Sequence, residues 1–274
     1  MMAVAPRRSW LYVPGDRPER FAKAAASGAE VVICDLEDAV GAANKAIARH
    51  AVADWLRGHR AMVRINSVGT PWHDDDVAAI ADAPGLAAVL LPKTDELPPI
   101  QQLEHRLAKH IDVIPLVETA AGVANAGAIA AAPQVAALAF GSIDFALDLG
   151  IDDTDAFDET SLLHARSTLV IASRAAGIAP PIDGISVSLS DAYAIRRDAH
   201  RARALGFGGK QCIHPRQVHE VNAAFNPSPA AIARARRVID AAEKSHGSAI
   251  QVDGQMIDKP RIDQARRVLS MEKR

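Results

Sequence analysis

The sequence predicts an α/β fold, a (β/α)₈ barrel of the TIM type, followed by a C-terminal extension of helices and a lid segment. Short apolar runs alternate with Ala-rich amphipathic stretches from end to end, which implies parallel strands joined by helical crossovers. Eight such units fit within roughly 225 residues, as a closed barrel requires. A doubly wound open sheet is the structural alternative, but VPGDRPER after the first run lacks the Gly-rich dinucleotide motif.

The apolar runs are the predicted strands, and the amphipathic stretches between them are the predicted helices. We expect strands at residues 9–13, 31–36, 62–66, 88–92, 113–118, 136–141, 184–187 and 209–214. We expect helices at residues 19–27, 45–57, 100–109, 121–131, 163–176, 192–205 and 217–225. Pro180 and Pro181 precede the seventh run and weaken its strand pattern.

Residues 227–274 follow a predicted barrel domain of residues 1–226 and are not needed to close it. A helix over 229–244 begins after Ser228, a plausible N-cap residue. The segment SHGSAIQVDGQMIDKP indicates a loop with a short extended piece, and a final amphipathic helix covers 261–271. We therefore expect this extension to serve as a lid, as an oligomer contact, or as both.

The composition favours helices packed on a buried sheet and excludes several functional classes. Hydrophobic residues make up 49% of the chain but aromatic residues only 4%, so Ala, Val, Leu and Ile must fill the core. Lys and Arg number 31 against 33 Asp and Glu, so there is no basic excess for nucleic acid. Cys34 and Cys212 lie in apolar runs, which is typical of a reducing cytoplasm and not of a disulfide scaffold.

The sequence also lacks the apolar segments that direct a chain to a membrane. The first residues, MMAVAPRRSWLYVPG, have no apolar stretch of the ~7–15 residues found in a signal peptide. No run approaches the ~18 apolar residues of a spanning helix. We expect a cytoplasmic protein without membrane contact.

Ionisable residues follow several of the predicted strands at the point where each strand ends. They are Asp35, Glu37, Asp38, Arg64, Lys93, Glu118, Asp144 and His214. The active site of a (β/α)₈ barrel lies at the carboxyl ends of its strands. Any one of these residues has a structural explanation, because strand ends and helix N-termini favour Asp and Glu. Their convergence on one rim predicts a catalytic site.

Glu118 and Asp144 are the predicted metal ligands. Glu118 follows the apolar run VIPLV, where an unpaired carboxylate is costly unless a cation is near. Asp144 follows another long apolar run on the neighbouring strand. Two hard oxygen ligands without a Cys or His pair suit Mg²⁺ or Mn²⁺ better than zinc. The structural alternative is that each carboxylate pairs with an Arg or Lys.

Three further residues at this rim have two interpretations each. Arg64 is a natural anchor for a substrate carboxylate, or it forms an ion pair with Asp35 or Glu37, and both can hold at once. His214 precedes a proline and fits a packed or capping histidine better than a base. Lys93 could contact a phosphate or carboxylate, and the metal site makes a Schiff base at this lysine redundant.

The chain resembles the citrate lyase β-subunit-like branch of the HpcH/HpaI aldolase superfamily, which includes malyl-CoA and citramalyl-CoA lyases. The matching motifs span nearly the whole chain in order. They are LYVPGDRPERFAKA, DLEDAV followed by Lys45, VRIN, LPK, PLVETAAGV, FGSIDFALDLG, KQCIHPRQ and GQMIDKP. No single motif is specific for this family, but the occurrence of all of them in this order and at compatible spacing is specific.

The resemblance implies roles for the residues at the strand ends. Glu118 of VET and Asp144 of GSID would be the magnesium ligands, and Arg64 of VRIN would bind the carboxylate of the keto acid. Glu37 of DLED would help to hold the water shell of the metal.

The resemblance also implies roles outside the metal site. Arg17 and Lys23 match residues that contact the phosphates of coenzyme A, and Asp258 matches an acid/base aspartate that a neighbouring subunit supplies across a trimer interface. The family assembles as homotrimers, sometimes paired into hexamers. One departure is Ile143, where many relatives carry an acidic residue, and the arginine pattern of PGDRPER also differs among relatives. Because of both departures, the resemblance does not determine the identity of the substrate.

The expected function is magnesium-dependent aldol or Claisen cleavage of a hydroxyacyl-CoA into a 2-keto acid and acetyl-CoA. A malyl-CoA-type thioesterase would need only a repositioned base. A class II pyruvate aldolase acting on free hydroxy-keto acids would use the same two carboxylates but would not need Arg17 and Lys23. A citrate lyase β subunit would require partner subunits, and a ligand-sensing barrel would leave the convergent ionisable residues without a purpose.

Overall fold

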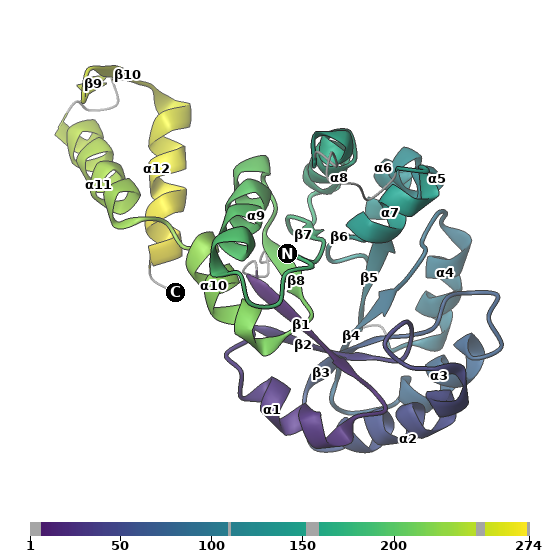
Figure 1. The fold of residues 1–274 in the computed structure, drawn as a ribbon. Helices are drawn as coiled ribbons and strands as arrows, with labels where there is room; N and C mark the ends of the chain where they lie inside the picture. The colour runs from purple at the N-terminus through teal and green to yellow at the C-terminus, as the bar shows by residue number, and fades with distance from the viewer. Residues whose placement is uncertain (1–6, 109–110, 152–158, 245–249, 273–274) are drawn as a thin grey trace. The chain divides into compact units, whose positions relative to one another are not determined.

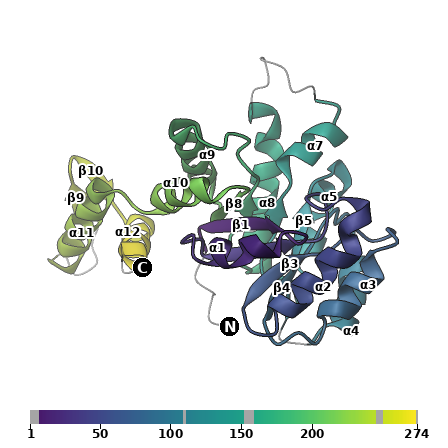
Figure 2. The same cartoon turned by 60° about the horizontal axis from the view of Figure 1, so that its bottom comes forward.

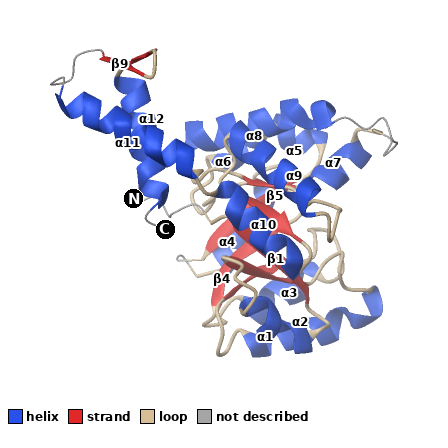
Figure 3. Cartoon of the chain, turned by 60° about the vertical axis from the view of Figure 1, so that its left-hand side comes forward, coloured by secondary structure: helices blue, strands red, loops and turns tan. Residues whose placement is uncertain are grey.

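Eight parallel strands close into a barrel in the computed structural model of the chain, which describes residues 7–108, 111–151, 159–244 and 250–272. Each strand pairs with its neighbours in chain order, and the eighth pairs with the first. The chain divides into two compact units, Met1–Asn222 and Ala223–Arg274. The first holds the barrel, with strands inside and helices around them (Figures 1 and 3). The predicted barrel is thus confirmed.

The barrel strands are short, and each one ends at the rim where polar residues begin. They are β1 Ser9–Pro14, β2 Val31–Asp35, β3 Ala61–Arg64, β4 Leu86–Leu91, β5 Asp112–Val117, β6 Ala139–Phe140, β7 Ile182–Asp183 and β8 Gly209–Cys212. Side chains such as Trp10, Ile33, Met62 and Ile114 point inward and form one buried cluster. Aliphatic residues therefore fill the barrel, as the low aromatic content predicts.

The helices of the first unit cover the outside of the strands. They are η1 Pro18–Arg20, α1 Phe21–Ala25, η2 Ala42–Asn44, α2 Lys45–Trp55, α3 His73–Ile80, α4 Pro98–Arg106, α5 Ala120–Ala124, α6 Ala126–Ala130, α7 Ser142–Asp148, η3 Glu159–Leu162, α8 Leu163–Ala176, α9 Ala192–Leu205 and α10 Pro215–Phe225. Helices α2, α3 and α4 lie side by side (Figure 2). Helices α8 and α9 have the predicted bounds, whereas α3 and α7 are additional helices that we did not predict.

The seventh strand was predicted two residues too late. It is Ile182–Asp183 and not residues 184–187, because it begins directly after Pro181, and Ile182 donates a backbone hydrogen bond to Leu138. It ends at Asp183 because the carbonyl of Gly184 accepts a hydrogen bond of 2.6 Å from the side chain of Lys210 instead of continuing the ladder.

The predicted helix over 121–131 is also wrong as a single element. It consists of α5 and α6, which meet at Asn125. The side-chain amide of Asn125 donates to the carbonyl of Asp95 at 2.8 Å and so ties the break to the neighbouring loop. The predicted helix over 100–109 ends at Arg106 in α4, and residue 109 lies outside the described residues.

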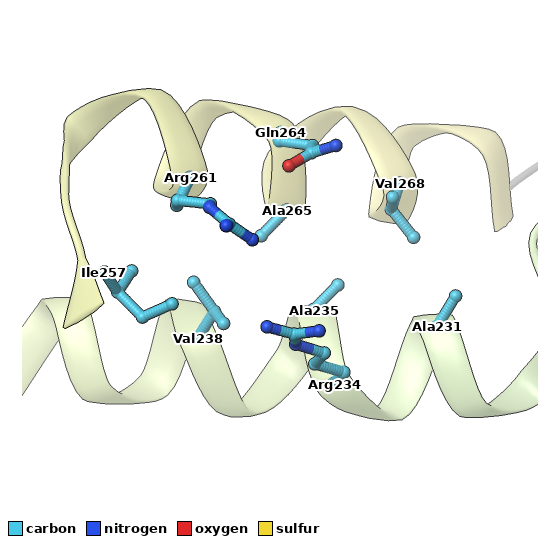
Figure 4. Close-up of a pocket in the computed structure, with 9 residues that line it drawn as sticks. All are labelled: Ala231, Arg234, Ala235, Val238, Ile257, Arg261, Gln264, Ala265 and Val268. Atoms are coloured by element: carbon cyan, nitrogen blue, oxygen red, sulfur yellow. The ribbon is translucent and has the colours of Figure 1, made fainter. Parts of the chain in front are cut away.

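The second unit is a helical hairpin with its own small core. It contains α11 Pro229–Lys244, the antiparallel strands β9 Ile250–Val252 and β10 Gln255–Ile257, and α12 Lys259–Glu272. Val238, Ile257 and Ala265 lie between the two helices (Figure 4). The hydroxyl of Ser228 accepts a hydrogen bond of 3.1 Å from the amide of Ala231, which confirms the predicted N-cap.

The predicted loop with a short extended piece is the β9–β10 hairpin in its described part, and residues 245–249 lie outside the described residues. Across the residues that the structure describes, no helix is both long enough and apolar enough to span a membrane.

Candidate active site

A cavity of about 370 Å³ opens at the carboxyl ends of the barrel strands. Its size is within the range of small-molecule sites. Its charged and polar lining residues are Tyr12, Asp35, Asp38, Arg64, Glu118, Ser142, Asp144 and Gln211. Its apolar lining includes Phe140, Ile143, Ile185 and Ile213. The predicted metal ligands and the predicted anchor Arg64 thus share one cavity.

Arg64 is the last residue of β3 and is held by carboxylates on two sides. Its Nε and Nη2 donate to the two oxygens of Asp35 at 2.7 and 2.6 Å, and its Nη1 lies 3.1 Å from Asp38. Its guanidinium also lies 4.9 Å from the centre of the Tyr12 ring. Although burial favours the neutral form, Asp35 raises the pKa of Arg64 well above its ordinary value. The ion pair that we weighed against a substrate role is therefore present.

Glu37 lies in the loop after β2 and faces both the arginine and the other carboxylates. Its Oε1 accepts a hydrogen bond of 2.8 Å from Ser67, while its buried Oε2 lies 3.0 Å from Nη1 of Arg64 without hydrogen-bond geometry. Burial raises the pKa of Glu37 to about 7, against the charge of Arg64 and helped by the charge of Asp38. Among the described residues, Oε2 of Glu37 therefore has an ion-pair partner but no hydrogen-bond partner.

Glu118 follows β5 directly, and Thr119 then starts α5 by accepting a hydrogen bond from the amide of Gly122 at 3.0 Å. The carboxylate is 2% exposed. Its Oε1 accepts a hydrogen bond of 2.7 Å from the backbone amide of Lys93, and its Oε2 packs so closely on Gly141 that a Cβ at that position would overlap it. Burial raises the pKa of Glu118 to about 8, and the charges of Glu37 and Asp144 add to this effect.

Asp144 lies in the first turn of α7, three residues after Gly141, and is half-buried. It is close enough to Glu118 for its charge to raise the pKa of Glu118. Within the described part of the chain, no cationic side chain forms an ion pair with either carboxylate. The structural alternative for this pair, two separate ion pairs with Arg or Lys, is therefore absent there.

The residues fit a magnesium-type cation better than a metal cage made by the protein alone. Over the described ranges, no group of three or more His, Cys, Asp or Glu side chains is arranged to hold a metal ion. Mg²⁺ is commonly bound by one or two carboxylates and keeps waters or substrate oxygens as its other ligands. Glu118 and Asp144 could supply such a pair. Burial is the main cause of the raised pKa of Glu118, the charges of Glu37 and Asp144 add to it, and a bound cation would favour the ionised form.

Two inward-facing residues of the site were missed by sequence reasoning. Tyr12 donates a hydrogen bond of 2.6 Å to Gln211, and Gln211 donates to the carbonyl of Phe140 at 2.9 Å. Burial raises the pKa of Tyr12 well above its ordinary value, so this phenol stays protonated. The signal was the alternation of β1, where Tyr12 shares the inward face with Trp10.

A buried lysine fixes the loop that carries Glu37. The Nζ of Lys45 donates to the carbonyls of Leu36 and Glu37 at 2.7 and 2.8 Å and to the side chain of Asn66 at 2.6 Å. Lys45 therefore has a structural role, because its three hydrogen bonds hold the loop that carries Glu37.

The remaining predicted residues have other surroundings within their own units. Arg17 and Lys23 are exposed on the segment that follows β1, and neither lines the cavity. Asp258 belongs to the second unit, where its Oδ1 accepts a hydrogen bond of 3.3 Å from the amide of Arg261 at the start of α12. His214 accepts a hydrogen bond of 3.1 Å from the amide of Arg216, which agrees with a capping histidine.

Known proteins resemble the chain over almost its whole length. The model of the HpcH/HpaI aldolase/citrate lyase family matches residues 8–215. A citrate lyase subunit beta-like protein of Deinococcus radiodurans is 37% identical and is aligned over 97% of both chains. A (3S)-malyl-CoA thioesterase of Cereibacter sphaeroides is 34% identical, with 97% of this chain and 94% of that protein aligned.

A solved structure shares both the barrel and the second unit. The crystal structure of protein CitE from Mycobacterium tuberculosis, in complex with magnesium, acetoacetate and coenzyme A, has a TM-score of 0.88 and 37% identity. The similarity covers 98% of this chain and 99% of that one. On this evidence the chain belongs to the HpcH/HpaI aldolase/citrate lyase family.

Proposed function

We propose that the chain is a Mg²⁺-dependent carbon–carbon lyase that cleaves a hydroxyacyl-CoA, such as malyl-CoA or citramalyl-CoA, into a 2-keto acid and acetyl-CoA. The observation that carries this proposal is one cavity with a fixed arginine on one side and, on the other, the carboxylates Glu118 and Asp144, which form no ion pair with the described cationic residues. The solved relative that is in complex with magnesium, acetoacetate and coenzyme A supports the same chemistry.

Arg64 would bind the carboxylate of the substrate. The two hydrogen bonds to Asp35 and the contact with Tyr12 hold its guanidinium in place before the substrate arrives. A fixed guanidinium orients the bond to be broken, and such positioning supplies a large part of many rate enhancements. This role requires the ion pair with Asp35 and does not compete with it.

Glu118 and Asp144 would hold the magnesium ion, and Glu37 would hold its water shell. Mn²⁺ is the alternative cation. When bound, the cation acts as a Lewis acid that stabilises the negative charge developing on the hydroxyl oxygen of the substrate. The buried position of Glu118 and the apolar wall around Phe140 limit water near that charge, which strengthens electrostatic interactions there.

Asp258 of a neighbouring subunit would protonate the enolate carbon of acetyl-CoA after the bond breaks, and would remove that proton in the reverse direction. This step requires an assembly of several copies, and we propose a homotrimer or a hexamer. Arg17 and Lys23 would bind the phosphates of coenzyme A, which agrees with their exposure on the segment after β1.

A thioesterase is the second candidate, because a (3S)-malyl-CoA thioesterase is 34% identical over nearly the whole chain. Hydrolysis would use the same anchor for the substrate carboxylate but would release free coenzyme A and an intact hydroxy acid. The two reactions therefore differ in their products and not in the residues that bind the substrate.

A panel of hydroxyacyl-CoA thioesters, assayed with and without EDTA, tests the proposal. We expect keto acid to appear only with a divalent cation, and Asp144→Ala to abolish it while the barrel stays folded by circular dichroism. Free thiol without keto acid would indicate the thioesterase. Full activity of Asp144→Ala that resists EDTA would refute the metal site.

A further inference from the structure

We infer that the backbone amide of Lys93 positions Glu118 for its cation, and that the left-handed backbone of Lys93 makes this possible by returning the chain to β5 at the next amide. The inference rests on the proposed function, since it assumes that Glu118 binds the cation. It adds Lys93 as a positioning residue: its backbone amide binds Glu118, while its side chain lies near Glu37.

The backbone of Lys93 is unusual for its residue type. Among the described non-glycine residues, only Lys93 and Asp253 have a positive φ, 49° and 51°. Asp253 precedes Gly254 in the turn of the β9–β10 hairpin, where an Asp-Gly pair commonly adopts this conformation. Lys93 has no such turn to explain it and follows Pro92 at the end of β4. Strained residues of this kind cluster at functional sites.

One amide at the end of β4 does not join the β4–β5 ladder, and the left-handed conformation of Lys93 turns the following amide back to β5. The two strands are in register as far as Leu91 and Pro115. Beyond that point the amide of Lys93 donates to Oε1 of Glu118 at 2.7 Å, and only the next amide, that of Thr94, returns to a backbone carbonyl, at 3.2 Å from that of Leu116. One backbone amide at the end of β4 therefore binds a side-chain carboxylate instead of a backbone carbonyl of β5.

This hydrogen bond holds one face of Glu118 while Gly141 closes the other. Oε1 is bound to the amide of Lys93, and Oε2 packs on Gly141, which begins the segment that carries Asp144. Both oxygens of a buried carboxylate are therefore located by groups without a charge. Partners of this kind in the outer shell of a metal site typically change metal affinity by about 10–100-fold when they are removed.

The side chain of Lys93 does not take part in this arrangement. Its ammonium group is half-exposed and lies 4.0 Å from Oε1 of Glu37. It faces a second hollow of about 300 Å³ whose lining also includes Ser67 and Trp72. The backbone and the side chain of Lys93 can therefore be tested independently.

The test compares Lys93→Gly with Lys93→Val in the full-length protein. Glycine adopts a positive φ freely and keeps the amide, so we expect its Mg²⁺ affinity to stay within about threefold of the wild-type value. Valine is β-branched and disfavours this conformation, so we expect affinity to fall about 10–100-fold. Mg²⁺ binding is measured by isothermal titration calorimetry, without substrate.

Three controls separate the amide from other causes. Lys93→Met removes the ammonium group and should bind Mg²⁺ within about threefold of wild type, because the amide remains. Gly141→Ala displaces Glu118 from its other side and should weaken binding as Lys93→Val does. Asp253→Val imposes the same backbone strain in the second unit and should leave Mg²⁺ affinity unchanged.

Two results would overturn the inference: wild-type affinity in a folded Lys93→Val protein, or equal losses in Lys93→Gly and Lys93→Val. If Lys93→Val does not fold, the pair Lys93→Asn and Lys93→Gln replaces it, because Asn tolerates the left-handed region better than Gln. In that pair only Lys93→Gln should lose affinity. A wild-type protein that binds no divalent cation would overturn the proposed function as well.

Discussion

Asp35 and Glu118 are two carboxylates that the barrel buries almost equally, at 1% and 2% exposure, but in opposite surroundings. Asp35 accepts two hydrogen bonds from Arg64 and one each from the amides of Glu37 and Ala39. Glu118 accepts one from the amide of Lys93, and its charged neighbours include two more acids. Asp35 forms an ion pair with Arg64, whereas no cationic side chain among the described residues forms an ion pair with Glu118.

The difference separates two sides of the site. The β2–β3 side, made of Asp35, Asp38 and Arg64, is a complete ion-pair network that holds its geometry without a ligand. The β5–β6 side brings the carboxyl groups of Glu118 and Asp144 close together without an ion-pair partner among the described residues, and a cation would stabilise their ionised forms. The β2–β3 side would therefore provide a fixed anchor for the substrate carboxylate, and the β5–β6 side would provide a binding site for the cation.

Glu118→Gln should produce the largest effect. We expect turnover to fall about 1,000-fold, because electrostatic stabilisation of the reacting oxygen is lost. In EDTA above pH 8 the same variant should be as stable as wild type or more stable, because Glu118 is then a buried charge without an ion-pair partner and the variant lacks that charge. Turnover is measured with the thioester panel and stability by thermal unfolding. A variant that keeps a tenth of the wild-type rate would contradict the metal role.

Asp35→Asn should lower the stability of the metal-free protein, whereas Glu118→Gln should not. Its loss leaves the buried guanidinium of Arg64 without its two-point partner, so we expect a loss of about 3 kcal/mol in the free energy of unfolding. Urea unfolding in EDTA measures this value, with Glu118→Gln as the matched control. If both variants lost the same stability, the two sides would not differ in charge balance.

The metal-free protein should become less stable as the pH rises from 5 to 8. Burial raises the pKa of Glu118 to about 8 and that of Glu37 to about 7, from an ordinary value of 4.5. Between these values the folded chain binds more protons than the unfolded chain, so stability is fully present below pH 4.5 and declines up to about pH 8. Glu118→Gln should flatten this decline, as urea unfolding at several pH values can measure. An unchanged pH dependence in Glu118→Gln would show that Glu118 titrates normally.

Asp38→Asn should have the smallest effect. Asp38 lies 3.1 Å from Arg64, but its side chain is 60% exposed. Exposed ion pairs contribute little, so we expect a change of at most about 0.5 kcal/mol in the free energy of unfolding. A loss as large as that of Asp35→Asn would mean that burial is not what distinguishes these two partners of Arg64.

The fold was predictable because its signals are local. Alternation of apolar runs and amphipathic stretches predicts eight strand–helix units, and α8, α9 and α11 have the predicted bounds. The seventh strand was misplaced because a side chain, that of Lys210, takes the carbonyl of Gly184 and ends the ladder there. No local pattern reports a bond between residues so far apart.

The sequence by itself determined that Arg64, Glu118 and Asp144 would lie at, or shortly after, the carboxyl ends of three barrel strands, which converge on one rim in a parallel barrel. Only the tertiary structure decided how their charges are balanced. Whether a buried carboxylate meets a guanidinium or another carboxylate depends on register and side-chain direction across strands, which no single segment encodes. The same is true of the amide of Lys93, which bonds to a side chain on another strand next to a backbone conformation that the residue type of Lys93 does not favour.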